Sequence, residues 1–333
     1  MRLLPSFRVW VLLLLSTALL TGCSWFGGGT KDDEEATETA GYTEEDFYQV
    51  IQSNLDARRW DLAIQNLQAL EAQFPFGDYA DQAQLELVYA RYRSGDYEAA
   101  IAAADRFVRL HPRHPNVDYA HYLKGLSQAR QSRGFLTGFM PIDQTQRDPA
   151  TAREAFATFN ELLARYPDSE YAPDARKRMI ALRNLLAREE INVANYYFRR
   201  GAWLAAANRG RYVVENYQRT PAVPDGLAVM AQAYHLLGYD DLSNDAVEVL
   251  ATNYPEYPFL NANGEFQYQE DMTGENRTFL NRVTFGLYDN RPPQGFDTRH
   301  IYEADPAEAL EDEDDAPRRS WWSRMTFGLF SDE

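Results

Sequence analysis

The chain has 333 residues, an apolar content of 45% and a formal net charge of −17. This length corresponds to about two domains of roughly 150 residues, and the apolar content excludes a chain that is disordered throughout. Most of the negative charge lies in two short segments, because residues 32–46 and 303–315 hold eight acidic residues each, whereas residues 47–302 carry 27 basic and 32 acidic ones. No basic surface is available to neutralise phosphates, so we expect no nucleic-acid partner. A single cysteine excludes an internal disulfide framework and a thiolate metal cluster.

Residues 1–22 have the pattern of a secretion signal. Two arginines precede the apolar run from Val9 to Leu20, which is too short to span a bilayer as a stable anchor. The run ends in Leu20-Thr21-Gly22-Cys23, which resembles a bacterial lipobox, where the cysteine thiol receives a diacylglycerol before cleavage. The alternative is an ordinary signal peptide that happens to contain a cysteine. We expect lipidation of Cys23 and removal of residues 1–22.

Residues 23–41 follow as a lipid anchor and a flexible acidic tether. Gly27 to Gly29 and the acidic run behind them are typical of a spacer between a membrane and a folded domain. Ser24, rather than aspartate, follows the cysteine, and by resemblance to enteric sorting rules this residue directs a lipoprotein to the outer membrane. The expected location is therefore the periplasmic side of the outer membrane, with the membrane contacted through Cys23.

An internal repeat occupies residues 42–258. In its clearest copy a glycine at 95 precedes Ala100, Phe107 and Pro112, and the prolines at 75 and 112 are 37 residues apart. The same frame fits five times, with insertions of 18 and 14 residues in the third and fourth copies. Its marker residues in the other copies are Arg58, Trp60, Ala63, Leu70 and Pro75; Ala150, Ala155, Leu162 and Pro167; Gly201, Trp203, Ala206 and Val213; and Gly238, Leu250 and Pro255.

Each copy is predicted to be a pair of antiparallel helices. Small residues allow the two helices to approach, large apolar residues fill the seam, and the proline ends the second helix. The first helix of each pair has its own apolar stripe, as in Phe47, Val50, Ile51 and Leu55. The expected fold is all-α, a superhelical solenoid of five tetratricopeptide-like helix pairs, with repeats 1–3 in residues 42–168 and repeats 4–5 in 169–258. Two unrelated helical bundles are the alternative.

An apolar insertion at residues 127–149 interrupts the third pair. It includes the run Gly134 to Pro141, with two phenylalanines and a methionine. Apolar side chains on a long loop either cover the core of the solenoid or bind a partner, and the sequence does not decide between the two.

Residues 259–333 are expected to be an acidic, largely disordered low-complexity tail. Two aromatic-basic segments within it, Arg282 to Tyr288 and Arg324 to Phe330, share Arg, Thr, Phe, Gly and Leu at the same spacing. They could be docking peptides, or they could cover apolar surface of the chain's own solenoid.

No pattern of a catalytic, metal or cofactor site is present. His111, His114 and His121 with Asp118 come nearest to a metal cluster, but the first two flank prolines between repeats and are expected in a solvated turn. Zincin, phosphate-loop and nucleophile-elbow motifs are absent from the sequence. We therefore expect no metal, no cofactor and no enzyme activity.

Three runs in the repeats resemble a known family. They are Asn195 to Trp203, Arg147 to Pro149 with Ala152 to Phe156, and Phe74 to Tyr79. Together they are similar to the BamD family, the tetratricopeptide-repeat lipoproteins of the outer-membrane β-barrel assembly machinery. The resemblance covers about residues 42–255, with the five repeats and both insertions in order, and does not include the tail.

The resemblance implies a periplasmic adaptor. The amino-terminal repeats of the family are thought to receive the carboxy-terminal targeting segment of unfolded outer-membrane proteins, and the carboxy-terminal repeats dock on the periplasmic domain of the barrel subunit. Smaller lipoprotein subunits also bind the solenoid. The alternative is another repeat-type periplasmic lipoprotein, such as a secretin pilotin or a cell-wall adaptor.

The resemblance also implies site residues. An extended strand that ends in an aromatic residue and a carboxylate is suited to an apolar slot beside guanidinium groups. Packing between repeats is the favoured role of Trp60 and Tyr79. The substrate-side candidates are Arg58, Arg59, Trp60, Phe76, Gly77, Tyr79 and Tyr92, and the barrel-subunit candidates are Tyr197, Arg200 and Arg209.

Overall fold

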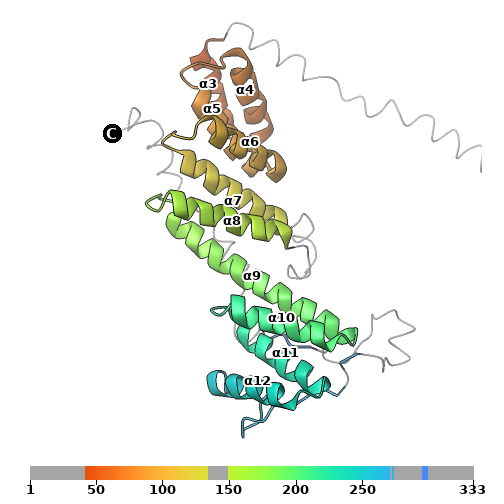
Figure 1. Cartoon of the computed structure of the whole chain (residues 1–333). Helices are drawn as coiled ribbons and strands as arrows, with labels where there is room; N and C mark the ends of the chain where they lie inside the picture. The colour runs from red at the N-terminus through yellow and green to blue at the C-terminus, as the bar shows by residue number, and fades with distance from the viewer. Residues whose placement is uncertain (1–41, 134–148, 271, 274–294, 299–333) are drawn as a thin grey trace, which may run out of the picture. The chain divides into compact units, whose positions relative to one another are not determined.

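The computed structural model describes residues 42–133, 149–270, 272–273 and 295–298. Ten α-helices lie in these ranges and follow one another along the chain (Figure 1). They are α3 (Glu44–Asp56), α4 (Trp60–Gln73), α5 (Ala80–Ser94), α6 (Tyr97–Leu110), α7 (Val117–Arg133), α8 (Ala150–Arg165), α9 (Ala172–Arg199), α10 (Trp203–Asn216), α11 (Val223–Leu236) and α12 (Asp240–Asn253). The prediction of an all-α array of five tetratricopeptide-like helix pairs is confirmed for these residues.

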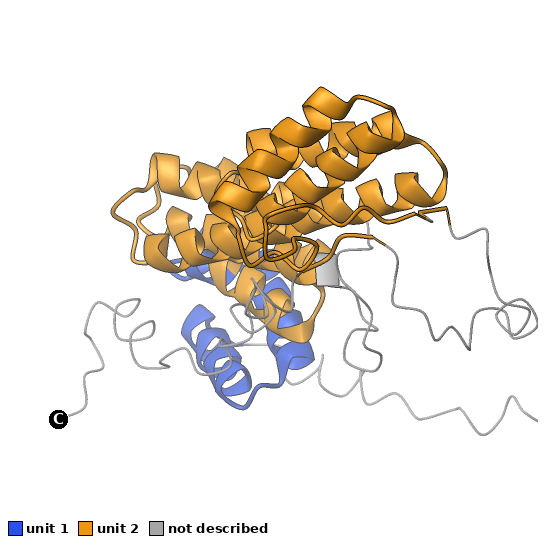
Figure 2. Ribbon diagram, turned by 90° about the horizontal axis from the view of Figure 1, so that it is seen from below, with its two compact units in different colours: residues 1–83 blue, residues 84–333 orange. Residues whose placement is uncertain are grey.

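The chain divides into two compact units, residues 1–83 and 84–333 (Figure 2). The first unit contains the pair α3 and α4 and the start of α5. Three of the four predicted stripe residues of α3, Phe47, Ile51 and Leu55, are buried in its core with Leu67 and Leu70 of α4, whereas Val50 is only half-buried. Apolar spacing at i, i+4 and i+8 thus places one face of α3 against α4.

The second unit has two apolar cores, and α9 contributes to both. Leu182 and Leu186 of α9 belong to the core that α7 and α8 build, while Ile191 and Phe198 belong to the core built with α10, α11 and α12. With 28 residues, α9 is about 42 Å long, at 1.5 Å per residue. The insertion predicted in the fourth repeat has therefore lengthened a helix, and this extra length lets α9 reach two cores.

A shared turn joins the two helices in four of the five pairs. Its positive-φ residue is Arg58, Gly95, Gly201 or Gly238, with φ between 56° and 86°. In each case the next residue donates its N–H to the carbonyl five residues earlier, as from Arg59 to Asn54 at 2.8 Å. This pattern is a Schellman motif, in which a left-handed residue ends the helix and glycine is favoured because it lacks a Cβ. The repeat glycine is thus a turn residue, and Arg58 occupies its position in the first pair.

The repeat proline ends the second helix of the pairs in which it is present. Pro75, Pro112, Pro167 and Pro255 each directly follow the C-cap residue of α4, α6, α8 or α12. The residue before a proline is pushed out of the helical region by the pyrrolidine ring. The predicted role of these prolines is confirmed.

Several predicted segments lie outside the described residues. They are Cys23, the signal and tether at 1–41, most of the apolar insertion 127–149, and the two aromatic-basic segments at 282–288 and 324–330. No helix in the described part of the chain is long and apolar enough to cross a membrane.

Part of the tail differs from the expectation of disorder. Leu260 and Phe266 form an antiparallel bridge, and Phe266, Met272 and Phe296 are buried in the second core. Phe296 packs on Phe198 of α9, and the Tyr268 hydroxyl lies 2.8 Å from the Ser243 hydroxyl of α12, so tail residues cover surface of the last two helix pairs. The repeat region therefore does not end the fold at residue 258.

Candidate functional site

A clamped loop between α4 and α5 presents Phe76 to solvent. The Glu44 carboxylate, in the first turn of α3, accepts hydrogen bonds from the backbone N–H groups of Asp78 at 3.1 Å and Tyr79 at 2.7 Å. A Cβ on Gly77 would lie 2.1 Å from the same carboxylate, so a larger residue there would displace the Glu44 side chain that holds the loop. Phe76, at the tip, is 99% exposed. The loop thus leaves one aromatic ring of the first unit in solvent, outside the core.

The other aromatic candidates of the first unit are packed. Tyr79 stacks on Tyr48, with ring centroids 4.3 Å apart, and Trp60 is half-buried as the first residue of α4. The Tyr79 ring therefore packs on an aromatic neighbour, and the packing role of Trp60 stays a prediction.

The substrate-side candidates do not form one slot. Arg58, Arg59 and Trp60 lie at the start of α4, whereas Phe76 and Tyr79 follow its end. A helix of 14 residues separates the two groups by about 21 Å. An extended peptide at about 3.3 Å per residue would need six or seven residues to contact both ends.

Tyr92 belongs to the second unit. It is half-buried on α5 against the core of α6 and α7, with its ring centroid 6.0 Å from that of Tyr97. The described contacts of Tyr92 are therefore with residues of the second unit, and not with the other substrate-side candidates.

A shallow hollow on α3 was missed by sequence reasoning. It is lined by Tyr42, Asp46, Gln49, Val50 and Ser53. Hydrogen bonds from the side chain and backbone N–H of Thr43 hold the pKa of the Asp46 carboxyl below its usual value. The spacing of these residues places them on one helix face, and Val50 among them was expected in the apolar stripe instead.

An exposed aromatic-basic pair ends α9. The Arg200 guanidinium lies 5.4 Å from the centroid of the Tyr196 ring, and its Nε donates a hydrogen bond to the Tyr196 hydroxyl at 3.2 Å. Tyr196 is 46% exposed and Arg200 is also exposed, while Tyr197 beside them is half-buried. A guanidinium held over an aromatic face is pre-organised for an acidic or planar partner group.

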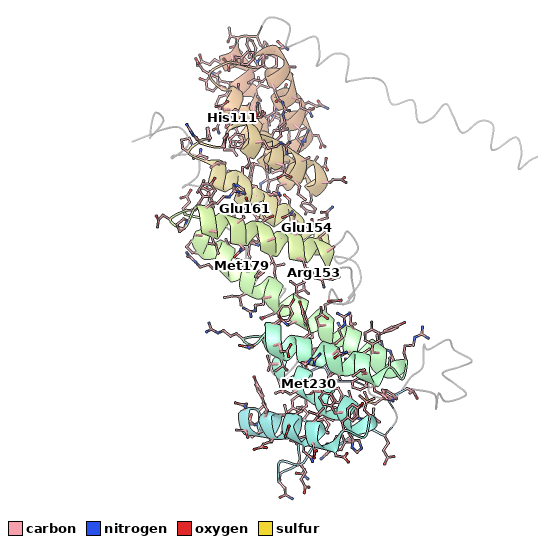
Figure 3. The ribbon with its side chains drawn as sticks, viewed as in Figure 1. His111, Arg153, Glu154, Glu161, Met179 and Met230 are labelled. Carbon is pink, nitrogen blue, oxygen red and sulfur yellow. The ribbon has the colours of Figure 1, made fainter. Side chains whose placement is uncertain are left out.

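Arg209 has a partner within the chain. Its Nη1 lies 2.7 Å from Oε2 of the buried Glu190, and this hydrogen bond raises the pKa of the arginine above its ordinary value. Arg153, on the first turn of α8 and labelled in Figure 3, lies close to the same acid, with its Nη2 3.7 Å from Oε1 of Glu190. Arg209 thus ties α10 to α9, and of the three barrel-subunit candidates only Arg200 is fully presented to solvent.

The histidine group does not form a metal site. His111 and His114 lie in the turn between α6 and α7, as predicted, but they are half-buried because both rings pack on Phe107, at 5.0 and 5.2 Å. His121 lies apart from them, buried on α7 beside the Tyr166 ring. No group of three or more metal-ligating side chains occurs in the described residues.

The free energy of unfolding is expected to decrease as pH falls, because His121 is buried. Neither ring nitrogen of His121 has a hydrogen-bond partner among the described residues. Burial holds its pKa below the ordinary value of about 6.5, with smaller opposing effects of nearby charges such as Glu161, which raises it, and Arg165, which lowers it. The unfolded chain therefore binds a proton at about pH 6.5 that the folded chain takes up only at lower pH. Between these two values the free energy of unfolding decreases as pH falls, by at most about 1.4 kcal/mol per pH unit for one proton.

Urea unfolding at pH 8, 6.5 and 5 measures this contribution. His121→Phe should remove part of the decrease below pH 6.5, because the buried ring can then no longer take up a proton. Equal pH dependence of wild type and His121→Phe would contradict the assignment.

Comparisons with known proteins agree on one family. Residues 41–250 match the family model YfiO, described as an outer membrane lipoprotein. A protein of Neisseria meningitidis named outer membrane protein assembly factor BamD is 41% identical over 251 residues, which cover 75% of this chain and 93% of that protein. Proteins of the same name from Xylella fastidiosa and Vibrio cholerae are 38% and 37% identical, over 74% and 72% of this chain and 82% and 96% of their own lengths.

Proposed function

Since the chain belongs to the BamD family of outer-membrane lipoproteins and has a role in outer-membrane protein assembly, we propose that it is a lipid-anchored periplasmic adaptor. In this proposal Cys23 carries the lipid, and the first unit binds the carboxy-terminal targeting segments of unfolded outer-membrane proteins. The fourth helix pair docks on the periplasmic domain of the barrel subunit, and smaller lipoprotein subunits bind elsewhere on the repeats. Family membership favours this role over a secretin pilotin or a cell-wall adaptor.

The observation that carries the docking proposal is the exposed pair of Arg200 and Tyr196 at the end of α9. Both residues lie inside the matched range 41–250, and both are exposed rather than packed in the core. An arginine that pairs with an acid across an interface sets specificity, and cutting one partner typically costs a few kcal/mol. Arg209 is the poorer docking residue, since its guanidinium already pairs with Glu190.

We expect Arg200→Glu to abolish co-purification with the barrel subunit. The change reverses the charge at the end of α9 and removes the contact with Tyr196, but it breaks no buried ion pair. Co-purification from detergent-solubilised outer membranes measures the effect, and at least a tenfold loss of recovered barrel subunit is expected, which corresponds to about 1.4 kcal/mol.

The matched control is Arg176→Glu, an exposed arginine near the start of the same helix. It makes the same charge change about 36 Å away, at 1.5 Å per residue, and should leave recovery unchanged. If both variants retain the barrel subunit, docking does not use this end of α9.

The first unit supports substrate binding through two separated features. Phe76 offers an exposed aromatic ring at one end of α4, and Arg58 and Arg59 offer two exposed guanidinium groups at the other. A targeting segment that contacts both would lie extended along the pair, with its carboxylate at the arginines and apolar side chains along the helix. The backbone of Arg58 supports this role further. Its φ of 56° is strained for any residue with a side chain, and backbone strain that is kept where glycine would relieve it often marks a functional position.

We expect Arg58→Gly to raise stability while lowering peptide affinity. Arg58 has φ of 56°, where glycine stands in three equivalent turns, so glycine relieves strain of about 1–2 kcal/mol and costs about 0.4–1 kcal/mol in the unfolded chain. The net gain in the free energy of unfolding is then about 0.5–1 kcal/mol, measurable by urea denaturation. Fluorescence anisotropy with a targeting-segment peptide should show weaker binding.

Arg59→Gly is the control for this pair of effects. Arg59 is the N-cap residue of α4 with φ of −85°, which any residue adopts, so glycine relieves no left-handed strain there and should change stability by less than about 0.5 kcal/mol. Peptide affinity that is unchanged in both variants would remove the two arginines from the substrate site.

A further inference from the structure

A tail segment of four residues, Gly295 to Thr298, is bound to the second unit like a peptide ligand. Its partners lie on α9 and α11, which pack on each other and are the first helices of the fourth and fifth pairs. Each of the four residues is held by a different kind of contact.

The Asn195 amide of α9 recognises the backbone of Phe296 at both polar groups. Its Nδ2 donates to the Phe296 carbonyl at 2.9 Å, and its Oδ1 accepts from the Phe296 N–H at 3.0 Å. A side-chain amide that pairs with both groups of one residue replaces the partner strand that an extended peptide would otherwise need. This is a way of binding main chain independently of sequence.

Two features select the side chains of the segment. An aromatic pocket holds Phe296, and there is no space for a side chain at Gly295. The Phe296 ring is fully buried, with ring centroids 5.9 Å from Phe198, 5.2 Å from Phe259 and 6.0 Å from Phe266. At the preceding residue, a Cβ on Gly295 would lie 2.6 Å from Oδ1 of Asn195, and φ there is 132°. The pocket therefore accepts an aromatic residue directly after a glycine.

The buried carboxylate of Asp225 binds Thr298, the last residue of the segment. Asp225 of α11 accepts hydrogen bonds from the Thr298 N–H at 3.0 Å and from the Thr298 hydroxyl at 2.9 Å. It is oriented by Arg188 and by the Tyr257 hydroxyl, and Arg188 also lies 3.6 Å from the Asp297 carboxylate. This arrangement favours an acid followed by a hydroxyl residue.

We propose that α9 and α11 form a peptide-binding site for the motif glycine, aromatic, aspartate, threonine, and that the chain fills this site with its own residues 295–298. The site is formed by α9 and α11, the first helices of two successive pairs. A segment of the same chain competes at an effective concentration on the order of millimolar, so the site is closed to weaker free peptides. A partner that carries the same motif could enter only by displacing the tail.

The test uses the full chain and a fluorescent peptide with the sequence of residues 291–301. The double variant Gly295→Val with Phe296→Ala should release the tail and bind the peptide, while the wild-type chain should bind it at least tenfold more weakly. Adding Asn195→Ala to the double variant should weaken binding at least tenfold, and Asn208→Ala, at an exposed position of α10, should not. A peptide with alanine in place of its phenylalanine should not bind.

A second experiment avoids the cavity that loss of Phe296 would leave. A protease site placed at residues 284–288 of the otherwise wild-type chain converts the tail into a separate fragment after cleavage. The fragment should stay bound during gel filtration, and excess peptide or Asn195→Ala should release it. Immediate loss of the fragment from the wild-type chain, or retention that neither the peptide nor Asn195→Ala changes, would overturn the proposal.

Discussion

Asp225→Ala is expected to lower the free energy of unfolding by about 3–5 kcal/mol, the largest loss that we expect from a single substitution in this chain. Asp225 is fully buried and accepts hydrogen bonds from Arg188, from the Tyr257 hydroxyl and from both donors of Thr298. Its removal leaves the buried guanidinium of Arg188 without its closest counter-charge, and desolvation of that charge is then uncompensated. Urea unfolding followed by circular dichroism measures the loss.

Two further variants separate charge burial from loss of packing. Glu215→Ala removes an exposed acid that pairs with Arg211 at 3.9 Å, and it should cost less than about 0.5 kcal/mol. Arg188→Met combined with Asp225→Leu leaves no buried charge, so it should cost less than Asp225→Ala alone. A loss below 1 kcal/mol for Asp225→Ala would show that Arg188 reaches water or another acid after the change.

Gly210→Val is expected to lower the free energy of unfolding by about 2–4 kcal/mol. A Cβ on Gly210 of α10 would lie 2.6 Å from the carbonyl oxygen of Gly226 on α11, and 2.8 Å from a methyl group of Val229. Replacing glycine inside a helix is otherwise favourable by up to about 1 kcal/mol, so a loss has to come from the helix contact. Because a backbone oxygen cannot rotate away, the two helices must separate.

Asn208→Val is the matched control, since it places the same side chain at an exposed position of α10. It should change stability by less than about 0.5 kcal/mol. Thermal and urea unfolding of both variants compare the two effects, and equal stabilities would mean that α10 and α11 adjust their spacing at little cost.

The repeat pattern predicted the helix pairs because it reflects local requirements. Gly95, Gly201 and Gly238 occupy left-handed turn positions, and Pro112 follows the end of a helix. Each of these signals depends on a few consecutive residues, so it can be read without knowledge of the fold. The buried alanines at the helix seams were predictable in the same way.

The candidate sites were only partly predictable, because they depend on partners distant in the sequence. Arg209 had the spacing of an exposed docking residue, yet Glu190, 19 residues earlier, takes up its charge. The two arginines of the first pair and Phe76 looked like one slot, yet the length of α4 separates them. Arg200 is exposed at the end of α9, where its hydrogen-bond partner Tyr196 is local in the sequence, and its docking role stays a prediction.

The signal and lipobox pattern, the five repeats and the family could be predicted from the sequence alone. Each depends on short segments and on the spacing between them. The tertiary structure alone decided that the tail contributes to the core. Phe296 is hydrogen-bonded to Asn195, and Thr298 to Asp225, across 101 and 73 residues of sequence. The local composition of an acidic tail does not predict these hydrogen bonds. Composition indicates what a segment can bury by itself, whereas the apolar and polar groups that α9 and α11 present decide what this segment buries in the folded chain.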